Sequence, residues 1–320
     1  MRPAYRLAVP RSPRLAVVPA GVRPWAADAV LAGGGTVVDL DDAEALVWTA
    51  TGWDPGYGPA DLQAAVAAHP RLRWVQLPWA GVELYAEAGV FDEARIWTCG
   101  KGVYAPPVAE HTLALVLAGM HHLKPYSEAR SWTAQAGRTL AGARVTIFGG
   151  GGITEELIRL LSPFRCRTTV VRKRPSPMGG VEQVLGWEDR DRALAGAQVV
   201  VLALALTPET GGSFGRAQFE AMERDAWLVN VARGGHVVTS ELVDALVQGS
   251  ICGAALDVTD PEPLPADHPL WALPNCIITP HTANTYEMAI PLLSARIADN
   301  VRRFALGEPL VGAVAADLGY

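Results

Sequence analysis

The segment RVTIFGGGGITEEL, residues 144–157, joins a short apolar run to four glycines and then to a stretch of helical composition. A buried strand, a glycine turn and a helix, in this order, form the site at which parallel α/β sheets bind the pyrophosphate of a dinucleotide. Gly149 permits the tight turn, and Gly151 lets the backbone approach phosphates, whose charge the free N–H groups of the helix favour. The segment predicts a dinucleotide site, with a glycine turn that holds no ligand as the alternative interpretation.

The residues that follow the next predicted strand indicate which dinucleotide is bound. Arg172, Lys173 and Arg174 stand in VVRKRPSP, where an NAD site normally carries an acidic residue for the ribose hydroxyls. Guanidinium and ammonium groups pair with a 2′-phosphate, which a carboxylate would repel. The cluster therefore favours NADP(H) over NAD(H), and a solvated basic turn is the alternative interpretation.

Short strand-like runs alternate with helical stretches along the rest of the chain, which predicts parallel sheets covered by helices. The runs occupy 14–19, 36–40, 45–50 and 73–78, and then 144–149, 168–172, 199–205, 226–232, 253–258 and 276–281. One long helix is expected over 108–132 and a terminal helix over 288–310. We expect an α/β fold of two Rossmann-like domains, with doubly wound parallel sheets and a cleft between them. In this prediction residues 1–104 and 287–320 form a substrate domain, and residues 105–286 form the dinucleotide-binding domain.

Composition and charge argue against several other classes of protein. Half of the 320 residues are hydrophobic and 19% are charged, which is ordinary for a globular chain. No apolar run approaches the roughly 20 residues of a membrane helix, and prolines interrupt the first residues before a signal-like apolar core can form. The four cysteines form no C-x-x-C pair, and a net charge of −6 disfavours a nucleic-acid surface. We expect a cytoplasmic protein without a metal site that binds neither nucleic acid nor a membrane.

Three side chains suited to catalysis closely follow apolar runs, at the predicted carboxyl ends of strands, where open α/β sheets bind ligands. They are Arg233 in VNVARGGHVV, Glu262 in ALDVTDPEPLP and His281 in IITPHTANT. Each alone has a simple structural explanation, namely a surface ion pair, a loop charge and a helix cap. The three together, after a nucleotide turn, indicate a catalytic set.

At this point the sequence resembles the D-isomer-specific 2-hydroxyacid dehydrogenase family, over nearly the whole chain. The resemblance is carried by VQLPWAGVE at 75–83, PPVAEHTLALVLA at 106–118, LALTPET at 204–210, the three catalytic stretches and NVRRFALGEPL at 300–310. The basic cluster and QLPWAGVE are more similar to glyoxylate/hydroxypyruvate-type reductases than to the phosphoglycerate branch. The departures from the family pattern are Thr154 in place of the last glycine, the basic cluster, and Asn284 where a small residue is commoner.

The resemblance implies roles that the chemistry of these side chains supports. His281 is the expected general acid, which protonates the carbonyl oxygen of a 2-keto acid as hydride reaches the carbon. Glu262 is expected to orient the imidazole ring and to favour its protonated form, and Arg233 to hold the carboxylate and polarise the carbonyl. The substrate is further expected to meet the backbone N–H groups of Ala80, Gly81 and Val82, and the side chains of Trp48 and Trp79. For these two tryptophans, ordinary packing is the alternative.

The resemblance also implies a cofactor site and an assembly. Beyond the glycines and the basic cluster, the expected cofactor contacts are Gly152, Ile153, Thr207, Pro208, Ala232 and Asp257. Asp257 is expected to accept a hydrogen bond from the nicotinamide carboxamide. A homodimer is expected, assembled largely through the helix around 108–122.

The leading hypothesis is an NADP(H)-dependent reductase of a small 2-keto acid such as glyoxylate or hydroxypyruvate. One alternative is an NAD-dependent dehydrogenase of another D-2-hydroxy acid. A second, from a different class, is a non-catalytic protein that senses a dinucleotide, because the same fold serves cofactor-responsive binding proteins.

Overall fold

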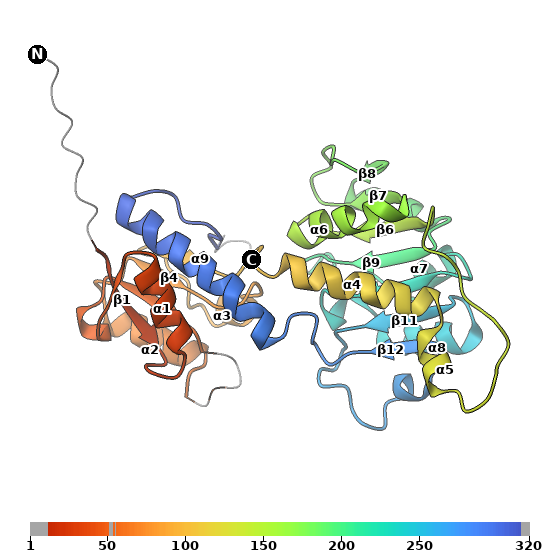
Figure 1. Ribbon diagram of the computed structural model, residues 1–320, viewed down its shortest axis with the longest axis horizontal. Coiled ribbons are helices and arrows are strands. Elements are labelled where there is room, and N and C mark those ends of the chain that lie inside the picture. The colour runs from red at the N-terminus through yellow and green to blue at the C-terminus, as the bar shows by residue number, and fades with distance from the viewer. Residues whose placement is uncertain (1–11, 51–53, 55, 315–320) are drawn as a thin grey trace, which may run out of the picture. The chain divides into compact units, whose positions relative to one another are not determined.

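The structure is a computed structural model, and it describes residues 12–50, 54 and 56–314. The chain divides into two compact units (Figure 1). Unit 1 comprises residues up to Tyr104 together with residues from Tyr286 onward, and unit 2 comprises Ala105–Thr285. The chain therefore crosses from one unit to the other twice, directly before helix α4 (Ala105–Met120) and at the start of helix α9 (Tyr286–Leu306).

Unit 1 is built on a five-stranded parallel sheet with the strand order β2-β1-β3-β4-β5. Its strands are β1 (Arg14–Val18), β2 (Thr36–Val37), β3 (Ala45–Trp48), β4 (Trp74–Gln76) and β5 (Ile96–Thr98). Its helices are α1 (Pro24–Ala32), α2 (Pro59–Ala68), α3 (Glu83–Glu87) and α9, which packs against α1. The central strand β3 is buried along its whole length, because side chains cover both of its faces.

Unit 2 carries a seven-stranded parallel sheet with the order β12-β11-β10-β9-β6-β7-β8. Its strands are β6 (Arg144–Phe148), β7 (Arg167–Val171), β8 (Gln183–Leu185), β9 (Val199–Leu202), β10 (Trp227–Asn230), β11 (Gly253–Leu256) and β12 (Cys276–Ile278). Its helices are α4, α5 (Leu123–Glu128), α6 (Gly152–Leu161), α7 (Arg216–Ala221) and α8 (Thr239–Gln248). The four central strands β6, β9, β10 and β11 are mostly apolar and almost wholly buried, as is usual for strands covered by helices on both faces.

The strand order of unit 2 reverses beside β6. The chain moves from β6 to β7 and β8 on one side, and then returns to place β9 and the later strands on the other side. In open parallel sheets, ligands bind outside the carboxyl ends of the strands at such a reversal. The turn after β6, which carries the four glycines, lies at this position.

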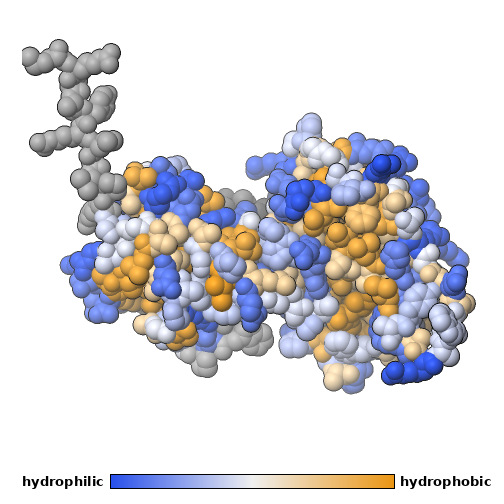
Figure 2. All heavy atoms as spheres, in the orientation of Figure 1, coloured by the Kyte–Doolittle hydropathy of each residue, from blue (hydrophilic) through white to orange (hydrophobic). Residues whose placement is uncertain are grey.

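These two sheets confirm the expected α/β class with doubly wound parallel sheets. The expectation of one long helix over 108–132 was wrong, because α4 ends at Met120 and the shorter α5 follows. The break lies at His122, which adopts a left-handed backbone conformation with φ +53° between the two helices. Figure 2 shows apolar side chains gathered over α4 and α6 on the visible face of unit 2.

Candidate active site

The turn between β6 and α6 is shaped by glycines that have different tasks. Gly149 has φ +114°, and a Cβ atom there would lie 2.0 Å from the carbonyl oxygen of Ala203, so no other residue fits. Gly151 is the N-cap of α6, and no atom lies within 4 Å of the Cβ position it leaves empty. The backbone of Gly152 and Ile153 continues directly into the first turn of the helix. The turn is therefore closed by packing on one side and open at the helix N-terminus, as a phosphate cradle must be.

Thr154 shows how this chain manages without the last glycine of the usual pattern. Its side chain is fully buried in the first turn of α6, and its hydroxyl donates to the carbonyl oxygen of Gly149 at 3.0 Å. The hydroxyl of Thr154 thus links the first turn of the helix to the glycine turn. The departure leaves Gly151 and the start of the helix open.

The basic cluster stands beside this turn. Arg172 follows β7, and its side chain crosses the turn so closely that a Cβ at Gly150 would lie 2.7 Å from Nε. Lys173 and Arg174 are exposed. A hydrogen bond from Thr207 is the main reason why the pKa of the Glu209 carboxyl is lowered, and the charge of Lys173 adds to this effect. Lys173 therefore lies near the loop after β9 that carries Thr207 and Pro208.

Arg233 lies in the loop after β10, and hydrogen bonds from the side chain of Asn230 hold this loop in place. The buried Asn230 accepts from the backbone N–H of Ala232 at 3.0 Å and donates to the carbonyl oxygen of Arg233 at 2.9 Å. Arg233 is half-buried, and its Nη1 donates to the carbonyl oxygen of Ala232 at 2.8 Å. A Cβ at Gly234 would lie 2.0 Å from the backbone of Thr259. The Arg233 loop is thus pressed against the loop after β11, which carries Glu262.

Glu262 and His281 form a direct pair at the carboxyl edge of the sheet. Oε1 of Glu262 lies 2.6 Å from Nδ1 of His281, and Oε2 accepts from the backbone N–H of Thr259 at 3.3 Å. Both side chains are about half exposed, at 42% and 54%. With Nδ1 engaged by Glu262, Nε2 is the ring nitrogen left to exchange a proton. The pair therefore has the geometry of a general acid–base histidine held by a carboxylate.

His281 sits in a strained backbone conformation that the surroundings enforce. Its φ is +53°, which is uncommon for a residue with a side chain. Its backbone N–H donates to the carbonyl oxygen of Asp257 at 2.8 Å. The neighbouring N–H groups of Thr282 and Ala283 donate to the Asp257 carboxylate at 2.9 and 3.0 Å. The loop that presents the histidine is thus organised around one aspartate.

Asp257 is buried, and its carboxylate is the most heavily bonded group near the site. Besides the two N–H groups, Oδ1 accepts from the Thr279 hydroxyl at 2.6 Å and lies 3.5 Å from Nε2 of His111 on α4. Burial would raise the pKa of this carboxyl, but these bonds outweigh burial and lower it. Both of its oxygens hold the His281 loop, and the expected contact of Asp257 with the nicotinamide carboxamide stays a prediction. His111, a lone histidine on a helix, was missed because nothing in the sequence links it to Asp257.

A second group missed from the sequence is His236, which is fully buried behind the Arg233 loop. Its ring nitrogens lie 3.1 Å from the carbonyl oxygen of Thr210 and 3.2 Å from that of Leu204. Burial lowers the pKa of this ring. A neutral imidazole has one N–H and can donate to only one of the two carbonyls. His236 therefore joins the loop after β9 to the loop after β10.

Unit 1 holds the predicted substrate residues in two different settings. Ala80, Gly81 and Val82 follow β4 and lead into α3, and their backbone N–H groups have no hydrogen-bond partner among the described residues. Trp79 is half-buried and packs near Tyr104, with ring centroids 6.4 Å apart. Trp48 is only 2% exposed and lies in the core of the unit. Trp79 and the three N–H groups thus stay predicted ligand contacts, whereas Trp48 is part of the core.

Metal-ligand clusters and membrane-spanning helices are both absent from the described residues. No group of three His, Cys, Asp or Glu side chains among them could hold a metal ion. Within the same residues, none of the helices combines the length and the apolar character needed to cross a membrane. Oδ1 of Asn284 is buried and finds no hydrogen-bond partner there, and nothing else in the structure explains this departure from the family pattern.

Comparison with known proteins gives matches over most of the chain. The NAD binding domain of the D-isomer specific 2-hydroxyacid dehydrogenases matches residues 112–283. A Corynebacterium melassecola protein, described as an uncharacterized protein in the proB 3′ region, is 37% identical over 91% of this chain and 95% of its own length. Glyoxylate/hydroxypyruvate reductase A of Serratia proteamaculans is 31% identical over 84% of this chain and 90% of its own length.

Solved structures extend the same match to the fold. The D-isomer specific 2-hydroxyacid dehydrogenase of Xanthobacter autotrophicus Py2, in complex with NADPH and MES, superposes with a TM-score of 0.82 at 27% identity. The match covers 97% of this chain and 100% of that one.

Proposed function

Because this chain belongs to the D-isomer specific 2-hydroxyacid dehydrogenase family, we propose that it reduces a small 2-keto acid, such as glyoxylate or hydroxypyruvate, with NADPH. Like the other members of this family, the chain is an oxidoreductase that depends on a nicotinamide dinucleotide. The observation that carries the proposal is the His281–Glu262 pair, 2.6 Å apart on the sheet whose first turn is the open glycine cradle. The Serratia relative, a glyoxylate/hydroxypyruvate reductase, supports the substrate class.

In this proposal the reaction is divided among three side chains of unit 2. Arg233 holds the substrate carboxylate and polarises the keto oxygen through its planar fork of donors. His281 gives the proton on Nε2 to that oxygen, so the keto group becomes a hydroxyl. Glu262 keeps the ring oriented from Nδ1 throughout the transfer. The bound nicotinamide supplies the hydride. In the reverse direction, His281 takes the proton back from the hydroxyl.

The residues around the glycine turn fit a dinucleotide. The empty Cβ position at Gly151 and the N–H groups at the start of α6, at Gly152 and Ile153, suit a pyrophosphate. Arg172, Lys173 and Arg174 would bind a 2′-phosphate, which is why we favour NADPH over NADH. The complex of the Xanthobacter protein with NADPH supports this preference. Thr207, Pro208 and Ala232 complete the proposed contacts on the loops after β9 and β10.

We further propose tasks for the two units and for the assembly. Unit 1 acts as the substrate domain, where the N–H groups of Ala80, Gly81 and Val82 supply donors for a carboxylate, and unit 2 binds the dinucleotide. A homodimer in the cytoplasm forms through the outer side of α4, where Leu113 and Leu117 are only half-buried. Figure 2 shows that this side is apolar, and sedimentation at micromolar concentration tests the dimer.

The variants His281→Asn and Glu262→Gln test the catalytic assignment. We expect kcat for hydroxypyruvate to fall by about 10²- to 10⁴-fold for His281→Asn and less for Glu262→Gln, because a general acid contributes on this scale. The dissociation constant of NADPH, measured by fluorescence, should stay unchanged. His69→Asn, a histidine of unit 1 that contacts Asp41, serves as the matched control. Full activity of His281→Asn would contradict the proposal, and tight NADPH binding with no turnover of any keto acid would favour a sensing protein.

A further inference from the structure

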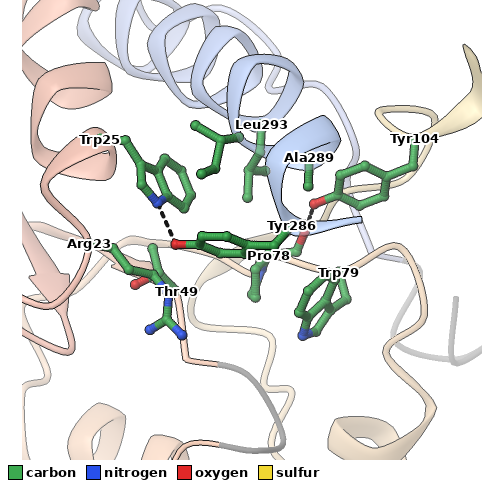
Figure 3. Close-up of a pocket in the computed structure, with 10 residues that line it drawn as sticks. Arg23, Trp25, Thr49, Pro78, Trp79, Tyr104, Tyr286, Ala289 and Leu293 are labelled. Atoms are coloured by element: carbon green, nitrogen blue, oxygen red, sulfur yellow. Dashed lines mark hydrogen bonds between the residues drawn. The ribbon is translucent and has the colours of Figure 1, made fainter. Parts of the chain in front are cut away.

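Unit 1 contains a pocket at the edge of its sheet where β1, β3 and β4 end (Figure 3). It has about 280 Å³ of empty space, which includes its open mouth. Arg23 follows β1, Thr49 follows β3, and Trp79 follows β4, while α9 closes the pocket with side chains such as Leu293. The carboxyl ends of parallel strands are the edge at which α/β sheets bind ligands.

Most of the wall of this pocket is apolar, and three of its polar groups already donate hydrogen bonds within unit 1. Nε1 of Trp25 donates to the Tyr286 hydroxyl at 2.8 Å, which Figure 3 shows as a dashed line. The hydroxyl of Thr49 donates to a backbone carbonyl of β1 at 3.1 Å. The Tyr104 hydroxyl donates to the carbonyl oxygen of Pro78. These groups shape the pocket, but they have little hydrogen-bonding capacity left for a ligand.

Among the described lining residues, Arg23 carries the polar atom that is both buried and without a hydrogen-bond partner. Its side chain is only 8% exposed, and Nη2 forms an ion pair with Asp54 at 2.7 Å. Nη1 is buried and has no hydrogen-bond partner among the described residues. A buried guanidinium nitrogen without an acceptor is costly, and an acceptor from a ligand or a water would remove that cost. The pocket therefore offers one strong donor within an apolar wall.

The charge of Asp54 limits what that donor can accept. The carboxylate already neutralises the guanidinium, and a second carboxylate would stand near Asp54 in apolar surroundings. An uncharged oxygen, such as a hydroxyl, accepts the hydrogen bond without this cost. The pocket thus suits a neutral oxygen carried on a short carbon chain.

We propose that Arg23 is a specificity-determining residue that binds the hydroxyl on C3 of the keto acid and so favours hydroxypyruvate over pyruvate. The inference rests on the proposed function, because it takes the substrate to be held by the N–H groups of Ala80, Gly81 and Val82. Trp79, which precedes these residues directly, lines the Arg23 pocket. Pyruvate has a methyl group at the same carbon and leaves Nη1 without an acceptor. Glyoxylate has no C3, so its turnover is independent of Arg23.

Two variants separate the effect of the Arg23 guanidinium from the effect of its ion pair with Asp54. Asp54→Asn removes the carboxylate and keeps Nη1, and Arg23→Met combined with Asp54→Asn removes both charges. The measured quantity is the ratio of kcat/KM for hydroxypyruvate to that for pyruvate. We expect Asp54→Asn to keep the wild-type ratio and the double variant to lose about tenfold or more of it, the scale of one hydrogen bond to a charged group. The kcat/KM for glyoxylate should differ little between the two variants.

An equal ratio in the two variants would overturn the proposal. A crystal structure of the wild-type protein with D-glycerate, the product of hydroxypyruvate reduction, gives a second test that needs no variant to fold. The C3 hydroxyl oxygen within hydrogen-bond distance of Arg23 Nη1 supports the proposal, and a hydroxyl bound elsewhere or only a water at Nη1 refutes it. If the wild-type enzyme reduces neither hydroxypyruvate nor glyoxylate, the proposed function fails instead.

Discussion

The substitution Asp257→Asn tests whether this carboxylate positions His281, the proposed general acid. Its oxygens accept from the Thr279 hydroxyl and from the N–H groups of Thr282 and Ala283, at 2.6 to 3.0 Å. Asparagine keeps one of the two oxygens and turns an NH₂ group toward one of the three donors. Three bonds to a charged group become two bonds to a neutral one, at a loss of about 1 kcal/mol each, and one buried N–H loses its acceptor at about 1–3 kcal/mol. We expect the free energy of unfolding to fall by about 3–5 kcal/mol.

The kinetic consequence follows from the position of His281 on the same loop. A shift of about 1 Å at a catalytic group costs on the order of 10² in rate. Asp257→Asn should therefore lower kcat by about 10²-fold while the dissociation constant of NADPH stays within a few-fold of the wild type. Urea denaturation, initial rates and a nucleotide titration measure the three quantities. The exposed Asp260→Asn, three residues further along, is the matched control and should change none of them.

The opposite pattern would refute this account of Asp257. If Asp257→Asn kept kcat and weakened NADPH binding strongly, the carboxylate would be a cofactor contact rather than a positioning group. The pH dependence adds a further check, since the pKa of Asp257 in the folded protein lies below its ordinary value of 3.8. A lowered carboxyl pKa stabilises the fold above that value and loses this contribution as the pH falls through the folded pKa. The acid limb of the stability curve should therefore be flatter in Asp257→Asn.

Three further predictions follow from the same structure. Gly149→Ala should lower the free energy of unfolding by about 3 kcal/mol or more, because the added Cβ would overlap the backbone of Ala203. Gly151→Ala should fold normally and bind NADPH roughly tenfold more weakly. Equal denaturation midpoints for the two variants would contradict this prediction. Burial lowers the pKa of His236 from 6.5, so wild-type stability should fall as the pH drops below that value, and His236→Asn should remove this slope in denaturant titrations at several pH values. Arg172→Ala with Lys173→Ala should raise KM for NADPH about 10- to 100-fold and leave KM for NADH unchanged, and an equal change for both nucleotides would remove the basic cluster from the cofactor site.

Much of the fold could be predicted from the sequence because its main signals are local. Fully apolar runs such as 199–202 are typical of strands that are buried on both faces of a sheet. Their alternation with helical stretches indicates parallel strands covered by helices. The glycine turn at Gly149 is equally local, because a sharp turn after a buried strand needs φ > 0. Arg233, Glu262 and His281 could be grouped because all three follow strand ends at one edge of a parallel sheet. Their roles stay predictions until the variants are measured.

The features of the site that the sequence did not predict depend on contacts between segments that are far apart in the chain. The partners of Asp257 include His111 on α4, and no spacing rule joins these two positions. The left-handed conformations of His122 and His281 are also imposed from outside, because local preference disfavours them. The orphaned nitrogen of Arg23 emerges only once three strand ends and a helix surround it. Such features are properties of the packed structure, which local sequence patterns do not encode.

The most direct test of the central proposal is the initial rate of NADPH and, separately, NADH oxidation by the purified protein, with glyoxylate, hydroxypyruvate and pyruvate offered in turn. We predict turnover of glyoxylate and hydroxypyruvate with a strong preference for NADPH. Turnover with NADH alone would contradict the role of the basic cluster and leave the catalytic assignment standing. If the protein bound NADPH tightly but showed no turnover with either nucleotide, this result would contradict the proposal that it is a reductase of 2-keto acids.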